Sequence, residues 1–572
     1  MTVSGDVEIT IQDGAAGVVV VPASQVQVVI GTCSGGTANL CVASRNANSL
    51  ATAVGYGPSV DQSAMSIAAG ATAIHVKAAT ATAGAINAMA AKTITAVSVA
   101  AVITSVAHGL TTGQRVTVAA VGGATEVNAT KRITVLTADT FTLNGITTAS
   151  AYTSGGTATP DGVMQLGTGT SEVTVTGSPY DAYLVKFLVT VGGTKGTTGI
   201  RFKLSLDAGR TYGPELALGT AATYAITGTG LTLAFGAGTL VAGDTATFGC
   251  VEPLASVANV QAALLALEAS PYSTSGWGSL RICGPRSGAD ASSIQGYLDT
   301  LVATKTWTSA IIEVRDNALP PAYGGSSTAE TDAVWSAAVA LDTSAVSAKR
   351  IAHVAGNYNM SSMFPVAAAG TPRLRRNGAY ALACRAVTIQ PQTHHGRVSD
   401  GSISQIIVDP TNDPADGFNY HDEHNAPSLD VARFVSFRRR KGKGGYFVVQ
   451  PRLMAPGGSI FAKPQGLPLR NVMDIGCSLL NQLHDDNINS DIRLNPNGTI
   501  DEIAAQGIEI VVRRGLTVGM FDKNMISGFA YTIDRATNVR VSDTVAWACT
   551  FFARGYILEI DGTVGFGTQD GG

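Results

Sequence analysis

The feature that most constrains the fold is an abrupt change in amino-acid composition and periodicity at about Lys92, which reverses at about Ser256. Between these points threonine, valine, alanine and glycine dominate, and short apolar–polar alternations are separated by glycine turns. Helical periodicity is almost absent there. This pattern predicts an all-β stretch that interrupts a domain of another class. The chain of 572 residues is long enough for roughly three or four domains.

On both sides of this stretch, helices and strands alternate. Strands are expected at 25–30 and 73–76, before the interruption. After it the sequence predicts three helix–strand pairs in succession, from VANVQAALLALEAS to RIAHVAG. Such alternation predicts a mainly parallel sheet covered by helices. A further helix is expected over RLRRNGAYALACRAV.

The last hundred residues combine two amphipathic helices with strands. The first helix, 472–483, has an apolar face formed by Val472, Ile475, Leu479, Leu480 and Leu483, while Asn471, Asp474, Gln482 and Asp485 are expected to face water. The second is predicted to start with a capping box of Thr499 and Glu502 and to end at Gly515. Its apolar face is expected to contain Ile500, Ile503, Ala504, Ile508, Val511 and Val512.

Several short strands are predicted near the two ends of the chain. Apolar residues alternate with polar ones at 7–11, and this first strand has no adjacent hairpin partner. It therefore needs the edge of a sheet, in its own subunit or in a neighbour. We expect inter-subunit strand pairing to involve Val7, Ile9, Ile11, Phe529, Tyr531, Ile533, Val545, Trp547, Tyr556, Leu558 and Ile560.

Composition points to self-association. Charged residues make up 14% of the chain, against about 25% in typical soluble domains. With a mean hydropathy of +0.21 and 65 glycines, the chain either buries more surface than a monomer can or places little charge on the surface that it exposes. The net charge of −3 predicts no general attraction to nucleic acid or anionic lipid. Seven scattered cysteines without a CxxC pair favour free thiols.

The last part of the chain runs through a helix, an NP-x-GTI turn, an amphipathic helix, a hairpin and GYILEIDGTVGF. This succession resembles the C-terminal domain of contractile phage tail sheath proteins. Further sheath-like strings are HDE followed by P-x-L-D, then RF, GGYFV and GGSIF. Within the β-rich stretch, HGL-x-TG and YTSGGTA resemble a small module of phage tail fibres and tail proteins, and SLDAGRT resembles β-rich insertions of tail sheaths.

The resemblance implies an α/β and α+β multidomain fold, with a tail-sheath-like core of mixed sheets and two inserted all-β modules. We expect an N-terminal arm, a sheath α/β domain in two parts, two β modules between those parts, and a C-terminal inner domain. The predicted boundaries are 1–22 for the arm, 23–91 and 257–465 for the α/β domain, 92–160 and 161–256 for the modules, and 466–572 for the inner domain.

The function implied by the resemblance is structural. Such a subunit polymerises helically around a tail tube and contracts, which drives the tube through a host envelope. The implied partners are further copies of the chain, the tail tube protein, and baseplate and tail terminator proteins, in a virion assembled in the host cytoplasm. No cofactor, nucleic acid or membrane insertion is expected. The expected tube-facing residues are Asp474, Asp485, Asp486 and Asp491.

Two other classes of function are compatible with the sequence. The β modules would also suit a tail fibre or adhesin. A metal-dependent hydrolase could use His421 and His424, but their i, i+3 spacing differs from the i, i+4 spacing of zincin helices, and their flanks predict a loop. His108, beside a turn glycine, is expected to be a packing residue, and the basic run 438–441 is expected to lie at a hairpin turn.

Overall fold

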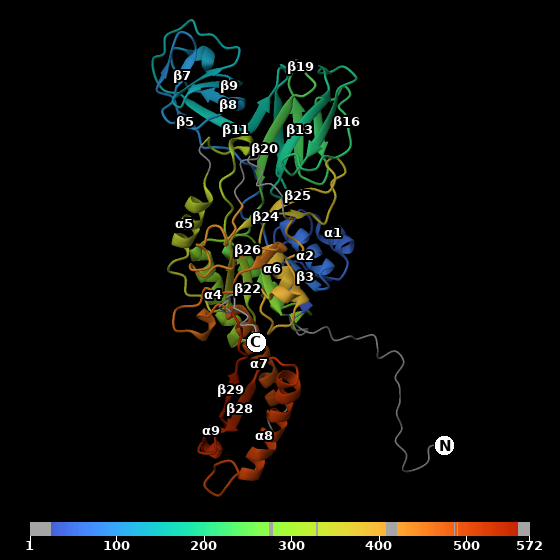
Figure 1. The fold of residues 1–572 in the computed structure, drawn as a ribbon, viewed down its shortest axis with the longest axis vertical. Coiled ribbons are helices and arrows are strands. Elements are labelled where there is room, and N and C mark those ends of the chain that lie inside the picture. Colours follow the sequence, from blue (N-terminus) through green and yellow to red (C-terminus); the bar gives the residue numbers. More distant parts are fainter. Residues whose placement is uncertain are drawn as a thin grey trace, which may run out of the picture.

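The chain forms three tiers along its long axis in a computed structural model (Figure 1). An α/β domain lies in the middle, a β-rich region at one end and the C-terminal residues at the other. The structure describes residues 25–273, 278–327, 330–407, 420–485, 487–488 and 490–558. The strand expected at 7–11 lies outside these residues. None of the helices in the described ranges is both long and apolar enough to cross a membrane.

The middle tier contains a six-stranded sheet in the order β2-β3-β1-β21-β22-β23. All neighbours are parallel except β2 and β3, so the predicted mainly parallel sheet is confirmed. The strands β1, β22 and β23 are buried along their whole length, which explains their continuous apolar runs. The strands are β1 (Val26–Gly31), β2 (Cys41–Ser44), β3 (Thr72–Lys77), β21 (Ser279–Pro285), β22 (Ala310–Glu313) and β23 (Ile351–Val354).

Helices cover both faces of this sheet. Leu264 of α3 and Leu298 of α4 belong to one apolar core with the sheet, and Met65 of α2 and Leu382 of α6 belong to a second core on the other face. The helices are α1 (Ala47–Val54), α2 (Pro58–Ala68), α3 (Val257–Glu268), α4 (Gly288–Ala303), α5 (Asp332–Asp342) and α6 (Ala379–Thr388), with short 3₁₀ helices η5 (Pro321–Tyr323), η6 (Val398–Asp400) and η7 (Ile460–Ala462).

Two hairpins complete this tier. The first corrects the sequence prediction of one helix over RLRRNGAYALACRAV, because its first five residues form a strand and Gly378 separates them from α6. The second hairpin carries the basic run 438–441 at its turn, as predicted. The strands are β24 (Asn357–Ser361), β25 (Arg373–Asn377), β26 (Phe437–Arg440) and β27 (Lys443–Val448).

The upper tier is formed by strands between residues 85 and 251. A twelve-stranded sheet runs β16-β15-β13-β20-β11-β8-β9-β10-β7-β6, with β4 and β5 attached beside β20 and β11. Its strands are β4 (Ala85–Ile86), β5 (Lys92–Thr93), β6 (Ala96–Val97), β7 (Val102–Thr104), β8 (Gln114–Ala119), β9 (Thr130–Thr137), β10 (Thr140–Leu143), β11 (Thr157–Leu166), β13 (Leu184–Val191), β15 (Arg201–Ser205), β16 (Leu216–Ala217) and β20 (Thr245–Val251).

Two separate apolar cores lie in this tier. Phe141 belongs to one, and Phe187 and Phe202 belong to the other, which also includes Leu374 of β25. The predicted boundary at 160/161 falls inside β11, which pairs with both β8 and β20. The remaining elements are β12 (Val173–Gly177), β14 (Gly193–Thr194), β17 (Thr223–Ile226), β18 (Leu231–Phe235), β19 (Thr239–Leu240) and the 3₁₀ helix η3 (Thr125–Val127).

The lower tier contains the predicted succession of two helices and a hairpin. Its elements are α7 (Gly466–Asp485), α8 (Glu502–Leu516), a π-helical continuation η8 (Thr517–Phe521), β28 (Gly528–Ile533), a short α9 (Val539–Ser542) and β29 (Trp547–Phe552). We call residues 466–558 the C-terminal domain. The strand expected at 556–560 is absent from its described part, 556–558, which has no regular structure.

Both predicted ends of α8 need correction. Its N-cap is Asp501, whose carboxylate accepts the N–H of Ile503 (3.1 Å), whereas Glu502 turns away to the guanidinium of Arg535 (2.8 Å). Gly515 lies inside the helix and does not end it. A Cβ atom at Gly515 would come within 2.5 Å of Leu483, so glycine there allows α7 and α8 to approach closely.

Candidate interaction surface

The hairpin of the C-terminal domain has two backbone edges, and their environments differ. In an antiparallel pair, every second residue directs its N–H and C=O away from its partner strand. Asp534 donates its N–H to the carbonyl of Ala546 (2.8 Å), which continues the register Thr532↔Ala548. The outward-directed residues are therefore Phe529, Tyr531 and Ile533 on β28, and Trp547, Cys549 and Phe551 on β29.

Side chains of α8 occupy the outer edge of β28. The guanidinium of Arg513 donates to the carbonyl of Tyr531 (2.7 Å), and the carboxylate of Glu509 accepts the N–H of Ile533 (2.9 Å). Glu509 also accepts from Arg535 (2.7 Å), and this bond lowers the pKa of Glu509. These bonds satisfy backbone groups that a further strand would need, so β28 is closed to strand addition at these positions.

The outer edge of β29 is open within the described part of the chain. This strand pairs with β28 and with no other described strand. Trp547 is 43% exposed beside the open edge and stacks on His484, with 4.7 Å between the ring centroids. The C-terminal domain thus offers one edge, that of β29, with N–H and C=O groups available for another strand.

The residues predicted for strand pairing lie in three places. Phe529, Tyr531 and Ile533 form β28, Val545 precedes β29, and Trp547 begins it. Tyr556 and Leu558 follow the hairpin as irregular chain, and the Tyr556 hydroxyl donates to the Gln392 carbonyl (2.8 Å). Val7, Ile9, Ile11 and Ile560 lie outside the described residues. The sequence did not reveal which hairpin edge is open, because that depends on Glu509 and Arg513.

One predicted tube-facing residue is corrected by the structure. Asp474 is only 7% exposed, and its carboxylate accepts from Arg350 (3.0 Å) and Arg470 (2.5 Å). Because Arg350 precedes β23, this ion cluster joins the C-terminal domain to the α/β domain. It leaves no free carboxylate for a partner.

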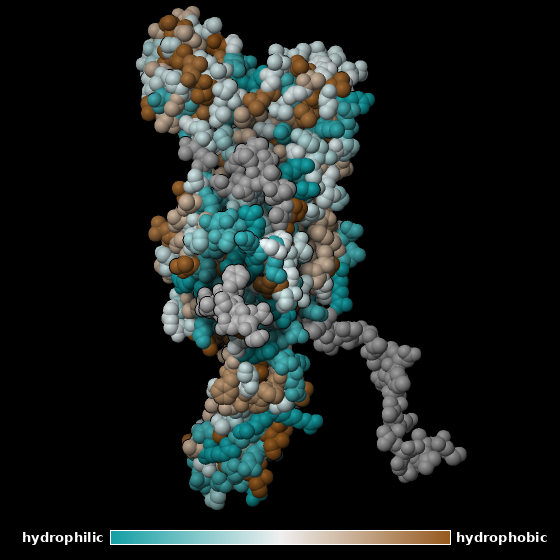
Figure 2. Space-filling view, viewed as in Figure 1, coloured by the Kyte–Doolittle hydropathy of each residue, from teal (hydrophilic) through white to brown (hydrophobic). Residues whose placement is uncertain are grey.

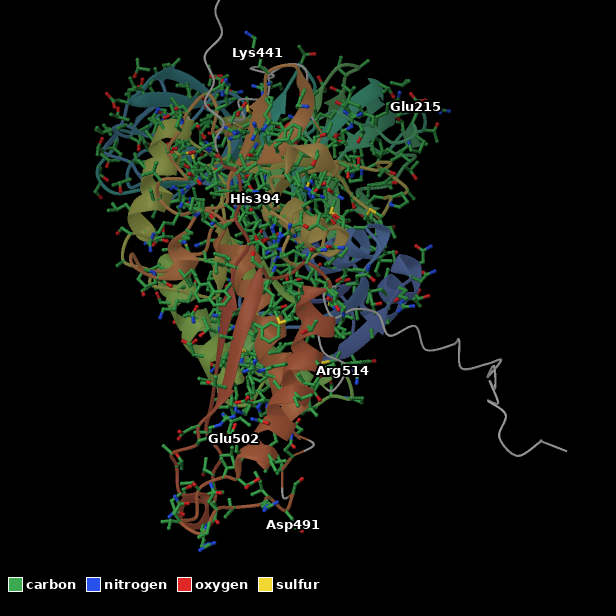
Figure 3. All side chains as sticks on the ribbon, turned by 60° about the horizontal axis from the view of Figure 1, so that its bottom comes forward. Glu215, His394, Lys441, Asp491, Glu502 and Arg514 are labelled. Atoms are coloured by element: carbon green, nitrogen blue, oxygen red, sulfur yellow. The ribbon has the colours of Figure 1, made fainter. Side chains whose placement is uncertain are left out.

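The other acidic candidates lie at the end of α7 and beyond it. Asp485 and Asp491 are exposed, and Asp486 lies outside the described residues. Figure 3 places Asp491 at the tip of the C-terminal domain, far from Lys441 at the turn of the basic hairpin. The acidic tip of the C-terminal domain and the basic hairpin of the middle tier are therefore separate surfaces.

The possible metal ligands at residues 421–424 make separate contacts in the structure. His421 is buried between the carboxylates of Asp332 (3.0 Å) and Glu423 (2.8 Å), Asp422 binds Arg439 (2.7 Å), and His424 is exposed. Among the described residues, no three histidine, cysteine, aspartate or glutamate side chains are grouped to hold a metal ion. His421 instead connects Asp332, at the start of α5, to Glu423 in its own loop.

Other titratable groups singled out in the sequence have packing roles. His108 is buried and packs in a T-shaped arrangement with Phe141, with 5.4 Å between the ring centroids, as expected for a packing residue. His394 contacts the amide oxygen of Gln450 (3.0 Å), and burial lowers the pKa of His395 to about 3. All seven cysteines are free.

A pH-dependent stability is expected from His421. Burial alone would lower its pKa, but the hydrogen bonds to Asp332 and Glu423 outweigh burial and raise the pKa from 6.5 to about 9. Protonated His421 therefore stabilises the fold fully below pH 6.5, and the stabilisation, about 3 kcal/mol at most, is lost as the pH rises through 9. Urea unfolding midpoints measured across this range should fall for the wild type. His421→Gln should flatten this fall; an equally steep fall in the variant would contradict the assignment.

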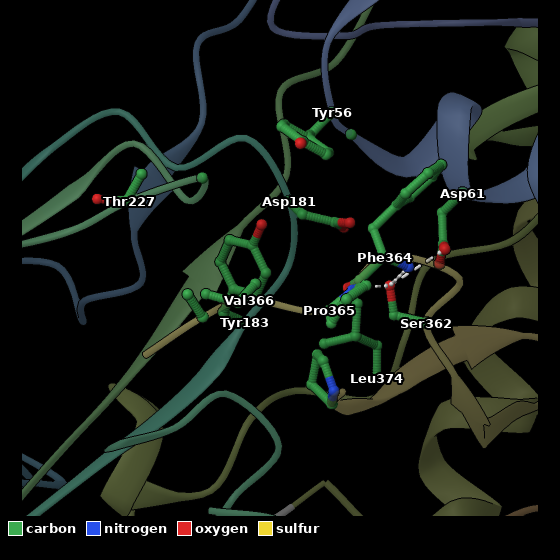
Figure 4. Close-up of a pocket in the computed structure, with 14 residues that line it drawn as sticks. Tyr56, Asp61, Asp181, Tyr183, Thr227, Ser362, Phe364, Pro365, Val366 and Leu374 are labelled. Carbon is green, nitrogen blue, oxygen red and sulfur yellow. Dashed lines mark hydrogen bonds between the residues drawn. The ribbon is translucent and has the colours of Figure 1, made fainter. Parts of the chain in front are cut away.

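A cavity of about 230 Å³ lies where the upper tier meets the α/β domain (Figure 4). Its walls include the carboxylates of Asp61 and Asp181, and both bind the buried guanidinium of Arg376, at 2.9 and 2.6 Å. Asp61 also accepts from the Ser362 hydroxyl (3.2 Å). Because both acids already pair with Arg376, neither carboxylate is free to bind a ligand. The ion cluster instead joins the two tiers.

Comparisons with known proteins give one family and several distant structures. A family model described as DUF2586, N-terminal domain, matches residues 4–450, and no curated protein matches the sequence. A sheath tail protein from Desulfitobacterium hafniense is 9% identical, with a TM-score of 0.41, and 96% of this chain and 100% of that chain are covered.

Two further solved structures are similar. A sheath tail protein from Listeria innocua is 10% identical, with a TM-score of 0.39, and 92% of this chain and 95% of that one are covered. The helical sheath of the anti-feeding prophage in its contracted state is 11% identical, with a TM-score of 0.33, and 56% of this chain and 78% of that one are covered. All three are described as sheath proteins, the class that the sequence resembles.

Proposed function

The chain belongs to the DUF2586 family, and on that premise we propose that it is a structural subunit of a contractile tail sheath. The observation that carries the proposal is the hairpin with one closed and one open edge. A closed edge at β28 and an open edge at β29 let each copy accept a strand on one side only. One-sided acceptance gives the contact a direction, which a polymer of identical copies needs.

The donated strands would come from the chain termini. The sequence predicts a strand at Val7, Ile9 and Ile11 with no hairpin partner. It predicts a second one at 556–560, whose described residues 556–558 have no regular structure within a single copy. Asp13 to Gly17 contain two glycines and two alanines, which suit a flexible linker. Strands held by backbone bonds to a neighbour would keep copies attached while their domains rotate as rigid bodies during contraction.

The three tiers suggest how a copy is oriented in the sheath. We assign the C-terminal domain to the inner radius, where Asp485, Asp486 and Asp491 would contact a tail tube. The β-rich tier lies at the opposite end of the molecule and would face outward, as two modules displayed on the surface (Figure 1). Baseplate and tail terminator proteins would bind the ends of the polymer in the virion. Contraction would draw on the difference in subunit contacts between two packings, without a cofactor or nucleotide.

Electron microscopy of the purified protein tests this function. We expect helical tubes or striated cylinders from the full chain, and folded monomers from a variant lacking residues 1–14, because its donor strand is missing. With tube protein added, Asp485→Lys should reduce binding to the tube more than it reduces self-assembly. Slender trimers would instead identify a fibre, and discrete globules at all concentrations would refute the sheath assignment.

A further inference from the structure

Helix α8 has two apolar faces, and the described residues of the chain cover only one of them. Ala505, Val512 and Leu516 are buried in the core of the C-terminal domain. On the other side, large apolar side chains are between 45% and 72% exposed, and Figure 2 shows brown atoms along that side of the domain. We call this set the α8 stripe; it consists of Ile503, Ile510 and Val511 of α8 and of Val518 and Phe521 in its continuation η8.

The α8 stripe runs along the helix for several turns. Ile503 and Ile510 are seven residues apart, which places them on the same side two turns apart. Arg514 projects from this side too, and its aliphatic stem adds apolar surface. A helix with apolar residues on opposite sides is normally covered on both, and a continuous exposed apolar surface usually marks a site of contact.

On the other side of the same domain, the hairpin has a face that no described part of the chain covers. Its inner side chains, including Tyr531 and Phe551, pack in the core with α7 and α8. The outer side chains are exposed and carry no charge. We call this set the outer sheet face; it consists of Ala530, Thr532, Ala548, Thr550 and Phe552. Its side chains are short except for Phe552, so it forms a shallow surface on which a helix can lie.

We propose that the α8 stripe of one copy packs on the outer sheet face of the next copy. The inference rests on the proposed function, because it adds a second contact to the copies joined by strand donation. The two faces are unlike and lie on opposite sides of the domain, as the helices and the hairpin do in Figure 1. Unlike, opposed faces make a head-to-tail contact, which repeats into rings or helical polymers.

The two contacts can coexist in one polymer. Strand addition at the edge of β29 extends the sheet within its plane, whereas a helix packs on the sheet from above. The backbone contact would hold neighbours together, and the apolar contact would fix the angle between their C-terminal domains. Because the α8 stripe is mainly apolar, the contact should persist at high salt, unlike a contact between charged surfaces.

Substitutions on both faces test the proposal. In the full chain, Ile510→Ser and Thr550→Lys should each lower the pelleted polymer at least tenfold, with unchanged circular dichroism and unfolding midpoint of the monomer. Leu341→Ser, at a residue of α5 that is 77% exposed, is the matched control and should polymerise normally. Normal polymerisation of both interface variants would overturn the proposal. So would an Ile510→Ser variant that polymerises normally but no longer binds tube protein.

Cross-linking provides a measurement that does not depend on tubes. An Ile510→Cys variant mixed with a Thr550→Cys variant should give a covalent dimer with a short bismaleimide, at a yield well above that of either variant alone or of wild type. If the wild type forms no polymer, the proposed function fails, yet this dimer at high protein concentration would still support the contact. Its absence under those conditions would overturn the contact as well.

Discussion

Cys549→Pro is expected to yield a folded monomer that no longer polymerises. The N–H of Cys549 points to the open edge of β29, away from Tyr531, its partner in register. Proline removes this donor and places its ring on the edge, so an incoming strand loses a hydrogen bond and meets a steric block. The bonds within the hairpin lie on neighbouring residues and remain. Pelleting and electron microscopy should show at least a tenfold loss of polymer.

Two controls distinguish the loss of the strand-accepting edge from a loss of stability. Cys549→Ala removes the same side chain but keeps the N–H, and should polymerise like the wild type. Thr550→Pro removes an N–H that faces Ala530 across the hairpin, and should lower the unfolding midpoint of the C-terminal domain. If Cys549→Pro polymerises as well as Cys549→Ala, the edge of β29 is not an acceptor, and the observation that carries the proposed function is wrong.

Arg376→Met is expected to have the largest effect on stability. Arg376 is 3% exposed, contacts both Asp61 and Asp181, and lies over the ring of Tyr380 at 5.1 Å. Burial raises the pKa of Asp61 even beside this guanidinium. Without it, two buried carboxylates would lose their counter-ion, and such losses cost about 3–5 kcal/mol. The unfolding midpoint in urea should fall accordingly, and the junction between two tiers should become accessible to protease.

The matched control is Arg201→Met, because Arg201 pairs with Glu215 at an exposed site where 53% and 36% of the side chains are accessible. Exposed pairs are screened by water and contribute little to stability, so this variant should unfold close to the wild type. Adding Asp61→Asn and Asp181→Asn to Arg376→Met should recover part of the loss, since no buried charge is then unpaired. Equal midpoints for Arg376→Met and Arg201→Met would show that the cluster is not a main source of stability.

Periodicity in the sequence predicted where helices and strands lie better than it predicted which of their faces are buried. The alternating period from residue 257 onward gave the helices and strands of the α/β domain, because each element there has one or two strongly apolar faces. It failed on α8, where Ile503 and Val511 were assigned to the buried face and are 72% and 56% exposed. Apolar residues stand on two sides of that helix, and periodicity alone cannot choose between them.

Long-range polar contacts could not be predicted from the sequence. Asp474 looked like a solvent-facing position of an amphipathic helix, yet Arg350, 124 residues earlier, draws it into the protein. The capping box at Thr499 failed for a similar reason, because Arg535 binds Glu502. The open edge of β29 likewise depends on which α8 side chains reach β28. Local patterns carry no information about such partners, and tertiary contacts decide them.

The pairing of β1 with β21 has a consequence for synthesis of the chain. Gln27 lies opposite Ser279, 252 residues later, so β1 leaves the ribosome long before this neighbour exists. At typical translation speeds of about 5–20 residues per second, that interval is roughly 10–50 s. The upper β-rich tier can fold during this interval. The backbone of β1, a strand rich in apolar side chains, stays unpaired along one edge until then. We therefore expect nascent chains of this protein to need chaperones until residue 285 has emerged.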